Sequence, residues 1–281
     1  MKRCFSSPLV LLVGLLVLAS TVSAQKTETP ALDGILQRLQ ENLDQYKALV
    51  PSFFCDEHVV SKKSPDPQHG DRVTDSTFRL KRVAIAEPDS DAILQESREI
   101  KMVNGRPANG TVLSGPTSLR GAFSGGLALV SLSQQACMRY TLKPIKPNHP
   151  KDPIVVQFVG VPASLRPYDC LMQEEISGRV SIDPATMQIK RMEFHAPHHL
   201  IVPEGYTWDV HPILQVVGTW DLSIDYAPVL LGGKSFWLPT KISETMIGTV
   251  GGVWTYDATY RNYHKLEVTS RIVPASEEPV P

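Results

Sequence analysis

The chain lacks an excess of either charge, because its 281 residues carry 28 Lys and Arg against 29 Asp and Glu. Nucleic acids and anionic membrane surfaces are held by clustered positive charge. We therefore expect no nucleic-acid partner. The sequence also lacks an internal repeat, and only its N-terminal region contains a long apolar run. No later segment is apolar enough to be expected to cross a membrane.

The apolar run near the N-terminus has the features of a secretory signal. Lys2 and Arg3 precede apolar residues 9–19, and small residues follow up to Ala24. This order is typical of a cleaved signal, and the run is shorter than the roughly 20 residues that span a bilayer. We predict cleavage after Ala24 and export to the periplasm or the extracellular space. An uncleaved membrane anchor is the alternative. Cleavage leaves 26 of the 28 basic residues against 29 acidic ones.

An amphipathic helix of about 20 residues is predicted next. Thr29 is suited to the N-cap and Pro30 to the first helical position, and Pro51 ends the pattern. Apolar residues recur between them mostly at steps of three and four, which places them on one face. They are Leu32, Ile35, Leu36, Leu39, Leu43, Tyr46, Leu49 and Val50. Such a helix must lie on another apolar surface.

The rest of the sequence predicts antiparallel strands. Alternation is clearest at Trp220, Leu222, Ile224 and Tyr226, and Gly232-Gly233 follows as a hairpin turn. Nine or ten such strands are expected, with no crossover helices between them, which argues against a doubly wound α/β fold. The predicted fold is mainly β (α+β).

We expect a curved antiparallel sheet, or unclosed β-barrel, with the long N-terminal helix packed on its concave face. After a signal at residues 1–24, residues 25–272 are expected to form a single half-barrel domain. Residues 273–281, "ASEEPVP" with its flanking residues, are expected to be a disordered tail.

Several short motifs carry a resemblance to a known superfamily. They include "YKALVPSFFCDE", "FWLPTK" and a hairpin pattern formed by Gly178, Val180, Ile182, Asp183, Ile189 and Arg191. In these motifs the chain resembles uncharacterised secreted bacterial proteins, whose sheet pattern is similar to that of the periplasmic lipoprotein carriers of the Lol type. The resemblance implies an unclosed β-barrel that holds an apolar ligand. It implies no catalytic residue.

We therefore expect a non-enzymatic carrier or sensor of a lipid or other apolar ligand in the cell envelope. The ligand would lie between helix and sheet, against Leu36, Leu39, Leu43, Trp220, Leu222, Ile224, Tyr226 and Phe236. The alternative within the same fold is an envelope protein whose core is fully packed and which works through a protein partner that the sequence does not name.

Three cysteines remain after signal cleavage: Cys55, Cys137 and Cys170. Gln-Ala-Cys at Cys137 matches the start of a cysteine-protease signature, but the residues that follow do not match it. Exported cysteines are usually paired, and three pairings are open. We favour Cys137–Cys170, since each precedes a strand that runs in the same direction and both sulfurs should lie at one end of the sheet. Cys55 would then be unpaired or bridge two chains.

The segment "HAPHHL" contains His195, His198 and His199, and His211 follows. Imidazoles commonly bind metal, so a secreted metal-dependent hydrolase is the alternative from another functional class. However, Pro197 interrupts the segment and no His-Glu-x-x-His helix contains it. We interpret the histidines as residues of an exposed connection between strands, and we predict no metal and no cofactor.

Overall fold

The structure is a computed structural model that describes residues 32–64, 71–83, 93–108, 121–123, 126–144, 151–201, 216–248 and 252–267. The predicted signal at 1–24 and the predicted tail at 273–281 lie outside these ranges, as does His211.

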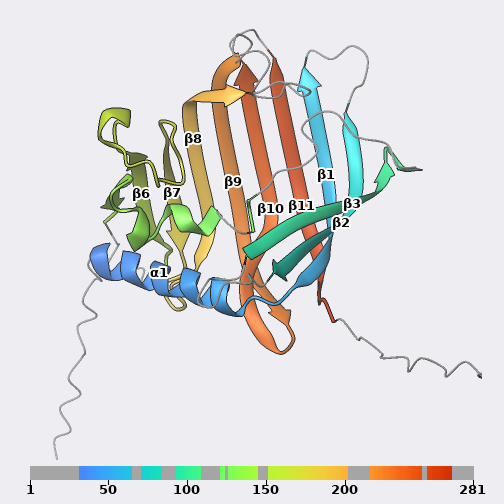
Figure 1. Ribbon diagram of the computed structural model, residues 1–281, viewed down its shortest axis with the longest axis horizontal. Coiled ribbons are helices and arrows are strands. Elements are labelled where there is room, and N and C mark those ends of the chain that lie inside the picture. Colours follow the sequence, from blue (N-terminus) through green and yellow to red (C-terminus); the bar gives the residue numbers. More distant parts are fainter. Residues whose placement is uncertain are drawn as a thin grey trace, which may run out of the picture.

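The described residues form one antiparallel sheet, as the alternating pattern predicts, and it has eleven strands where nine or ten are expected. The strands are β1 (Phe53–Ser64), β2 (Arg72–Val83), β3 (Ile93–Val103), β4 (Arg106–Pro107), β5 (Met138–Leu142), β6 (Ile154–Gly160), β7 (Ser177–Ile182), β8 (Ile189–Ile201), β9 (Val216–Leu231), β10 (Lys234–Gly248) and β11 (Val253–Lys265). Their order is β4-β3-β2-β1-β11-β10-β9-β8-β7-β6-β5. The sheet is strongly curved but unclosed, since β4 and β5 are its two edges (Figure 1).

The pairing of β1 with β11 joins the two ends of the described chain in the middle of the sheet. Val59 lies opposite Ala258, and Ala258 lies opposite Ile242 of β10, so one row of buried apolar side chains crosses the junction. All other neighbouring strands follow one another along the chain. This single long-range pairing makes one continuous concave face out of two meanders.

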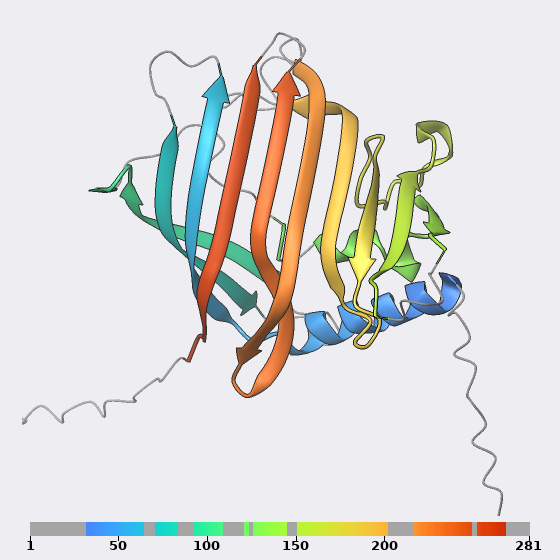
Figure 2. The ribbon, with the colours of Figure 1, turned by 180° about the vertical axis from the view of Figure 1, so that it is seen from behind.

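Helix α1 (Leu32–Leu49) lies along one end of the concave side, from the β5 edge towards the start of β1 (Figures 1 and 2). The predicted apolar stripe is the buried face of the helix. Its buried members are Ile35, Leu36, Leu39, Leu43 and Tyr46. The polar face is exposed and contains the Arg38–Glu41 ion pair.

A second segment covers the concave face beside α1. It consists of residues 121–123 and two 3₁₀ turns, η1 (Gly126–Leu129) and η2 (Leu132–Gln134). The Phe123 ring stacks on Phe78 with centroids 4.2 Å apart and meets Tyr260 edge-on at 5.0 Å. Most of the hollow under this segment is therefore filled by side chains.

The expected disulfide is present between Cys137 and Cys170, whose Cα atoms are 5.6 Å apart. Cys137 directly precedes β5, and Cys170 lies in the connection between β6 and β7. Cys55 is a buried free thiol, and burial raises its pKa above the ordinary range. In the described part of the chain, no helix is long and apolar enough to span a membrane.

Candidate functional site

A pocket of about 340 Å³ lies between α1 and the adjacent end of the sheet. Its walls come from one face of α1, from η1, and from the starts of β8 and β10. The lining residues are Leu39, Asn42, Leu43, Gln45, Tyr46, Leu49, Leu127, Gln188, Ile189, Lys234, Ser235, Phe236 and Trp237. We call this space the α1 pocket. Its volume is at the lower end of the roughly 300–1,000 Å³ typical of small-molecule sites.

The local sequence explains why these segments meet. Gly232 and Gly233 both have positive φ, 57° and 81°, and they allow the tight turn that sends β10 back along β9. This hairpin extends beyond the helix at that end of the sheet (Figure 1). On the opposite side, the Asn42 amide donates a 2.7 Å hydrogen bond to the carbonyl oxygen of Met187 in the β7–β8 turn. The helix is thus attached to the β7–β8 turn, and the pocket lies between the helix and the start of β10.

The pocket is chemically suited to an apolar molecule with one polar end. Leu39, Leu43, Ile189 and Phe236 present hydrocarbon surface, whereas amides and Lys234 provide its polar groups. The described lining contains no carboxylate, so the only charged side chain in it is Lys234.

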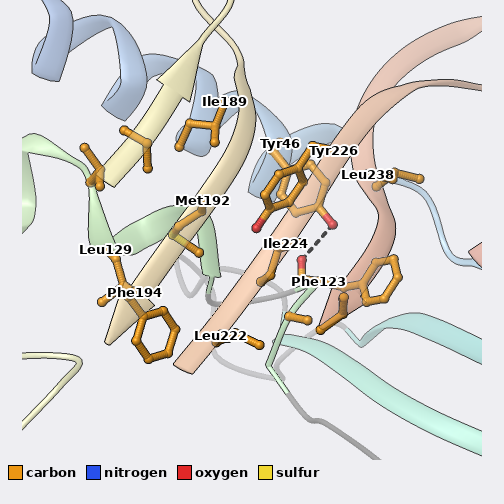
Figure 3. Packing of buried hydrophobic residues seen from close by; sticks show 14 of the residues in the cluster. Tyr46, Phe123, Leu129, Ile189, Met192, Phe194, Leu222, Ile224, Tyr226 and Leu238 are labelled. Atoms are coloured by element: carbon orange, nitrogen blue, oxygen red, sulfur yellow. Dashed lines mark hydrogen bonds between the residues drawn. The ribbon is translucent and has the colours of Figure 1, made fainter. Parts of the chain in front are cut away.

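Three of the eight predicted lining residues, Leu39, Leu43 and Phe236, line the α1 pocket. The remaining five are elsewhere in the hollow. Leu222, Ile224 and Tyr226 belong to the continuous packed core (Figure 3). Leu36 is also part of that core, and Trp220 is partly buried against it. Contact of any of the eight with a ligand stays a prediction.

Two buried phenols near the α1 pocket differ in their partners. The Tyr46 hydroxyl donates a 2.7 Å hydrogen bond to the Phe123 carbonyl oxygen (Figure 3). The Tyr226 hydroxyl is buried and has no hydrogen-bond partner among the described residues. Burial raises the pKa of both phenols above their ordinary value, so both are neutral at any physiological pH.

Sequence reasoning missed an ionic cluster on the concave face. The Arg98 guanidinium donates to the Glu57 carboxylate at 2.9 Å, and the Ser76 and Tyr260 hydroxyls donate to the same carboxylate at 2.6 and 2.9 Å. Glu57 is only 2% exposed. Its position between Cys55 and Val59, on the inward-facing parity of β1, is the signal that predicts burial.

Glu244 is the second inward-facing carboxyl that sequence reasoning missed. It follows Ile242 on the inward parity of β10 and is 8% exposed. Burial raises its pKa to about 7, and the neighbouring Trp220 indole offsets part of that rise. The carboxyl is therefore close to half ionised at neutral pH.

The interpretation of the histidines as a connection between strands is wrong. His195, His198 and His199 lie within β8, which continues through Pro197 because the register shifts between Ala196 and His199. A bulge tolerates proline because the ladder hydrogen bond is already interrupted there.

The histidines have separate partners. His195 pairs with Asp221 at 2.8 Å, and His199 pairs with Glu174 at 2.7 Å and contacts the Trp220 ring. The described ranges contain no group of three metal-binding side chains.

No protein-family model and no curated protein matches this chain. Solved structures similar to it include a LolA superfamily protein from Nitrosomonas europaea (14% identity, 83% of this chain and 94% of that chain covered, TM-score 0.35). Another is a putative outer membrane lipoprotein-sorting protein domain from Vibrio parahaemolyticus (10% identity, 80% of this chain and 89% of that chain covered, TM-score 0.36). A third is a DUF1329 family protein from Desulfovibrio piger (11% identity, 83% of this chain and 92% of that chain covered, TM-score 0.37). The Lol superfamily that the sequence motifs resemble is thus among the structural neighbours. At these identities and TM-scores the likeness assigns no function.

Proposed function

We propose that this protein is an exported, non-enzymatic carrier or sensor that binds a lipid or other apolar ligand in the α1 pocket. The observation that carries the proposal is a pocket with leucine and aromatic walls between a helix and the concave face of an unclosed sheet. Ligand sites are typically apolar hollows with a few polar groups at defined positions, and this pocket has that composition. Export is supported by the signal-like residues 1–24.

The position of Leu43 supports a helix that lines a ligand pocket in preference to a helix that only fills the hollow of the sheet. Leu36 and Leu39 are part of the continuous core cluster, whereas Leu43 is buried at 4% exposure but lies outside that cluster. Its side chain lines the α1 pocket. A bound acyl chain would give Leu43 the apolar surroundings that the packed core gives Leu36.

Binding of a fluorescent fatty-acid probe to the purified protein tests the proposal. We expect saturable binding that raises the melting temperature, because a ligand that binds only the folded state stabilises it. Leu43→Trp enlarges a side chain inside the pocket and should weaken probe binding at least about tenfold, which corresponds to about 1.4 kcal/mol.

Leu36→Ala is the matched control, since it alters the same face of α1 inside the core. It should lower stability and leave the affinity of the folded protein for the probe unchanged. Absence of saturable binding to the unmutated protein would favour the alternative of a packed-core protein that acts through a protein partner.

A further inference from the structure

The inward-facing side chains of the sheet divide the concave face into an apolar and a polar region. On β6 to β9 they are apolar and buried: Val156, Phe158, Val180, Ile182, Met192, Phe194, Leu222 and Ile224. On β1, β2 and β10 the buried inward positions include polar ones: Glu57, Ser61, Thr74, Ser76 and Glu244. Carboxylates are rarely buried unless they are paired. Glu57 follows that rule, because Arg98 pairs with it.

Glu244 departs from the rule. It lies opposite Leu222 on one side and Tyr256 on the other, and neither carries a charge. Burial raises the pKa of this carboxyl, and the uncharged Trp220 indole offsets part of the rise. In the described part of the chain, no Lys, Arg or His forms a salt bridge with Glu244. Among the described residues, the carboxyl is thus a buried acid without a counter-charge.

Aromatic groups surround this carboxyl. Trp220 lies opposite Met246, one inward position beyond the Leu222–Glu244 pair. Its buried indole N–H acts on the Glu244 carboxyl and lowers the pKa of that group, but it makes no hydrogen bond of normal geometry with any described residue. Phe194 meets the Trp220 ring edge-on at a centroid distance of 4.7 Å. The surroundings of the carboxyl therefore combine aromatic rings, aliphatic surface and an indole N–H that interacts with the carboxyl itself.

We propose that Glu244, Trp220, Tyr256 and Leu222 form a binding site for an organic ammonium group attached to an apolar group. The ammonium supplies the counter-charge that Glu244 lacks, and aromatic rings attract cations through their π-electrons. Leu222 and Phe194 offer surface for the apolar part.

A metal ion fits this site poorly. Hard cations require several oxygen ligands, and the described ranges contain no group of three metal-binding side chains. Two cationic side chains of this face have partners elsewhere: Lys63 lies over the Trp254 ring at 6.0 Å, and Arg98 pairs with Glu57.

This site is separate from the α1 pocket, so the inference goes beyond the proposed function. Glu244 lies eight residues along β10 from Phe236, which lines the α1 pocket, and that separation is roughly 25 Å along a strand. The two sites can therefore be tested independently.

Calorimetric titration of the full chain at pH 8 with n-octylammonium and with n-octanol tests the site. The two probes share a chain length and differ in charge. We expect octylammonium to bind at least about tenfold more tightly, as a charge-assisted contact to a buried carboxylate provides. Glu244→Gln retains the shape and removes the charge, and it should abolish the preference. Glu193→Gln, the same change on the convex face, should retain it.

Carbon-13 NMR of the Glu244 carboxyl provides a second readout. Near pH 7, saturation with octylammonium should shift this signal to the ionised form, because the bound cation favours the carboxylate. Equal affinity for the two probes, a preference that survives Glu244→Gln, or an unchanged carboxyl signal would each overturn the proposal. The fatty-acid probe should bind Glu244→Gln normally, so failure here leaves the α1 pocket as a separate question.

Discussion

The Tyr46 hydroxyl of α1 lies 2.7 Å from the Phe123 carbonyl oxygen and donates a hydrogen bond to it. On its other side, the segment at 121–123 is held by Glu96 of β3, whose carboxylate accepts bonds from the Gly121 and Phe123 amides at 3.0 Å each. The segment is thus attached both to the helix and to the far half of the sheet. This attachment positions the Phe123 ring against Phe78 and covers the hollow between them.

Tyr46→Phe should destabilise the protein by about 1–3 kcal/mol, because it leaves a buried carbonyl oxygen without that donor. Tyr226→Phe is the matched control, since its hydroxyl has no partner among the described residues. It should be neutral or slightly stabilising. Urea unfolding followed by circular dichroism measures both. Equal losses for the two variants would show that the Tyr46 hydrogen bond adds nothing to stability.

Leu39→Ala tests whether α1 only fills the hollow of the sheet or forms the wall of a ligand pocket. Leu39 belongs to the core cluster and also lines the α1 pocket. Truncation of a fully packed leucine costs about 2–5 kcal/mol. We expect a loss at the lower end of that range, and we expect the fatty-acid probe to raise the melting temperature. A loss at the upper end, together with no effect of the probe, would contradict the carrier function and leave the fold unaffected.

The Cys137–Cys170 disulfide should be recovered by peptide mapping without reduction, with Cys55 as a free thiol. The bond spans 33 residues of sequence, and in the loop-entropy model such a cross-link contributes about 4 kcal/mol. The Cys137→Ser/Cys170→Ser double variant should therefore unfold at markedly lower urea concentration. Recovery of Cys55 in a disulfide with either partner would contradict the pairing.

Glu244 should make stability depend on pH. Its pKa rises from 4.5 in the unfolded chain to about 7 in the folded protein, so the folded state binds the proton more tightly. Its contribution is therefore complete below pH 4.5 and is lost as the pH rises to about 7, by about 3 kcal/mol in total.

Glu244→Gln removes that dependence. Between pH 4.5 and pH 8, the free energy of unfolding of the variant should rise relative to that of the unmutated protein by about 3 kcal/mol. Thermal unfolding at several pH values checks the prediction, and a difference that does not change with pH would show that Glu244 is solvated in the folded state.

Local sequence patterns determined the elements of this protein. The three- and four-residue spacing of the leucines specifies α1 and its buried face, because helical periodicity is a property of neighbouring residues. Alternation from Trp220 to Tyr226 specifies the two faces of β9 in the same way. Gly232-Gly233 specifies the hairpin, since its positive φ values suit glycine. Strand direction also favoured the observed pairing, Cys137–Cys170, among the three that were open.

Only the tertiary structure decided how these elements combine into sites. The pairing of β1 with β11 depends on side chains about 200 residues apart in sequence, and no local period contains that information. The same pairing brings Glu57 next to Tyr260 and makes its burial tolerable. β8 continues through Pro197 because the register against β9 shifts there, so the strand pairing does not require the amide hydrogen that proline lacks. The α1 pocket and the unpaired Glu244 likewise exist only where separate strands and the helix meet, because burial and volume depend on the three-dimensional packing of distant residues.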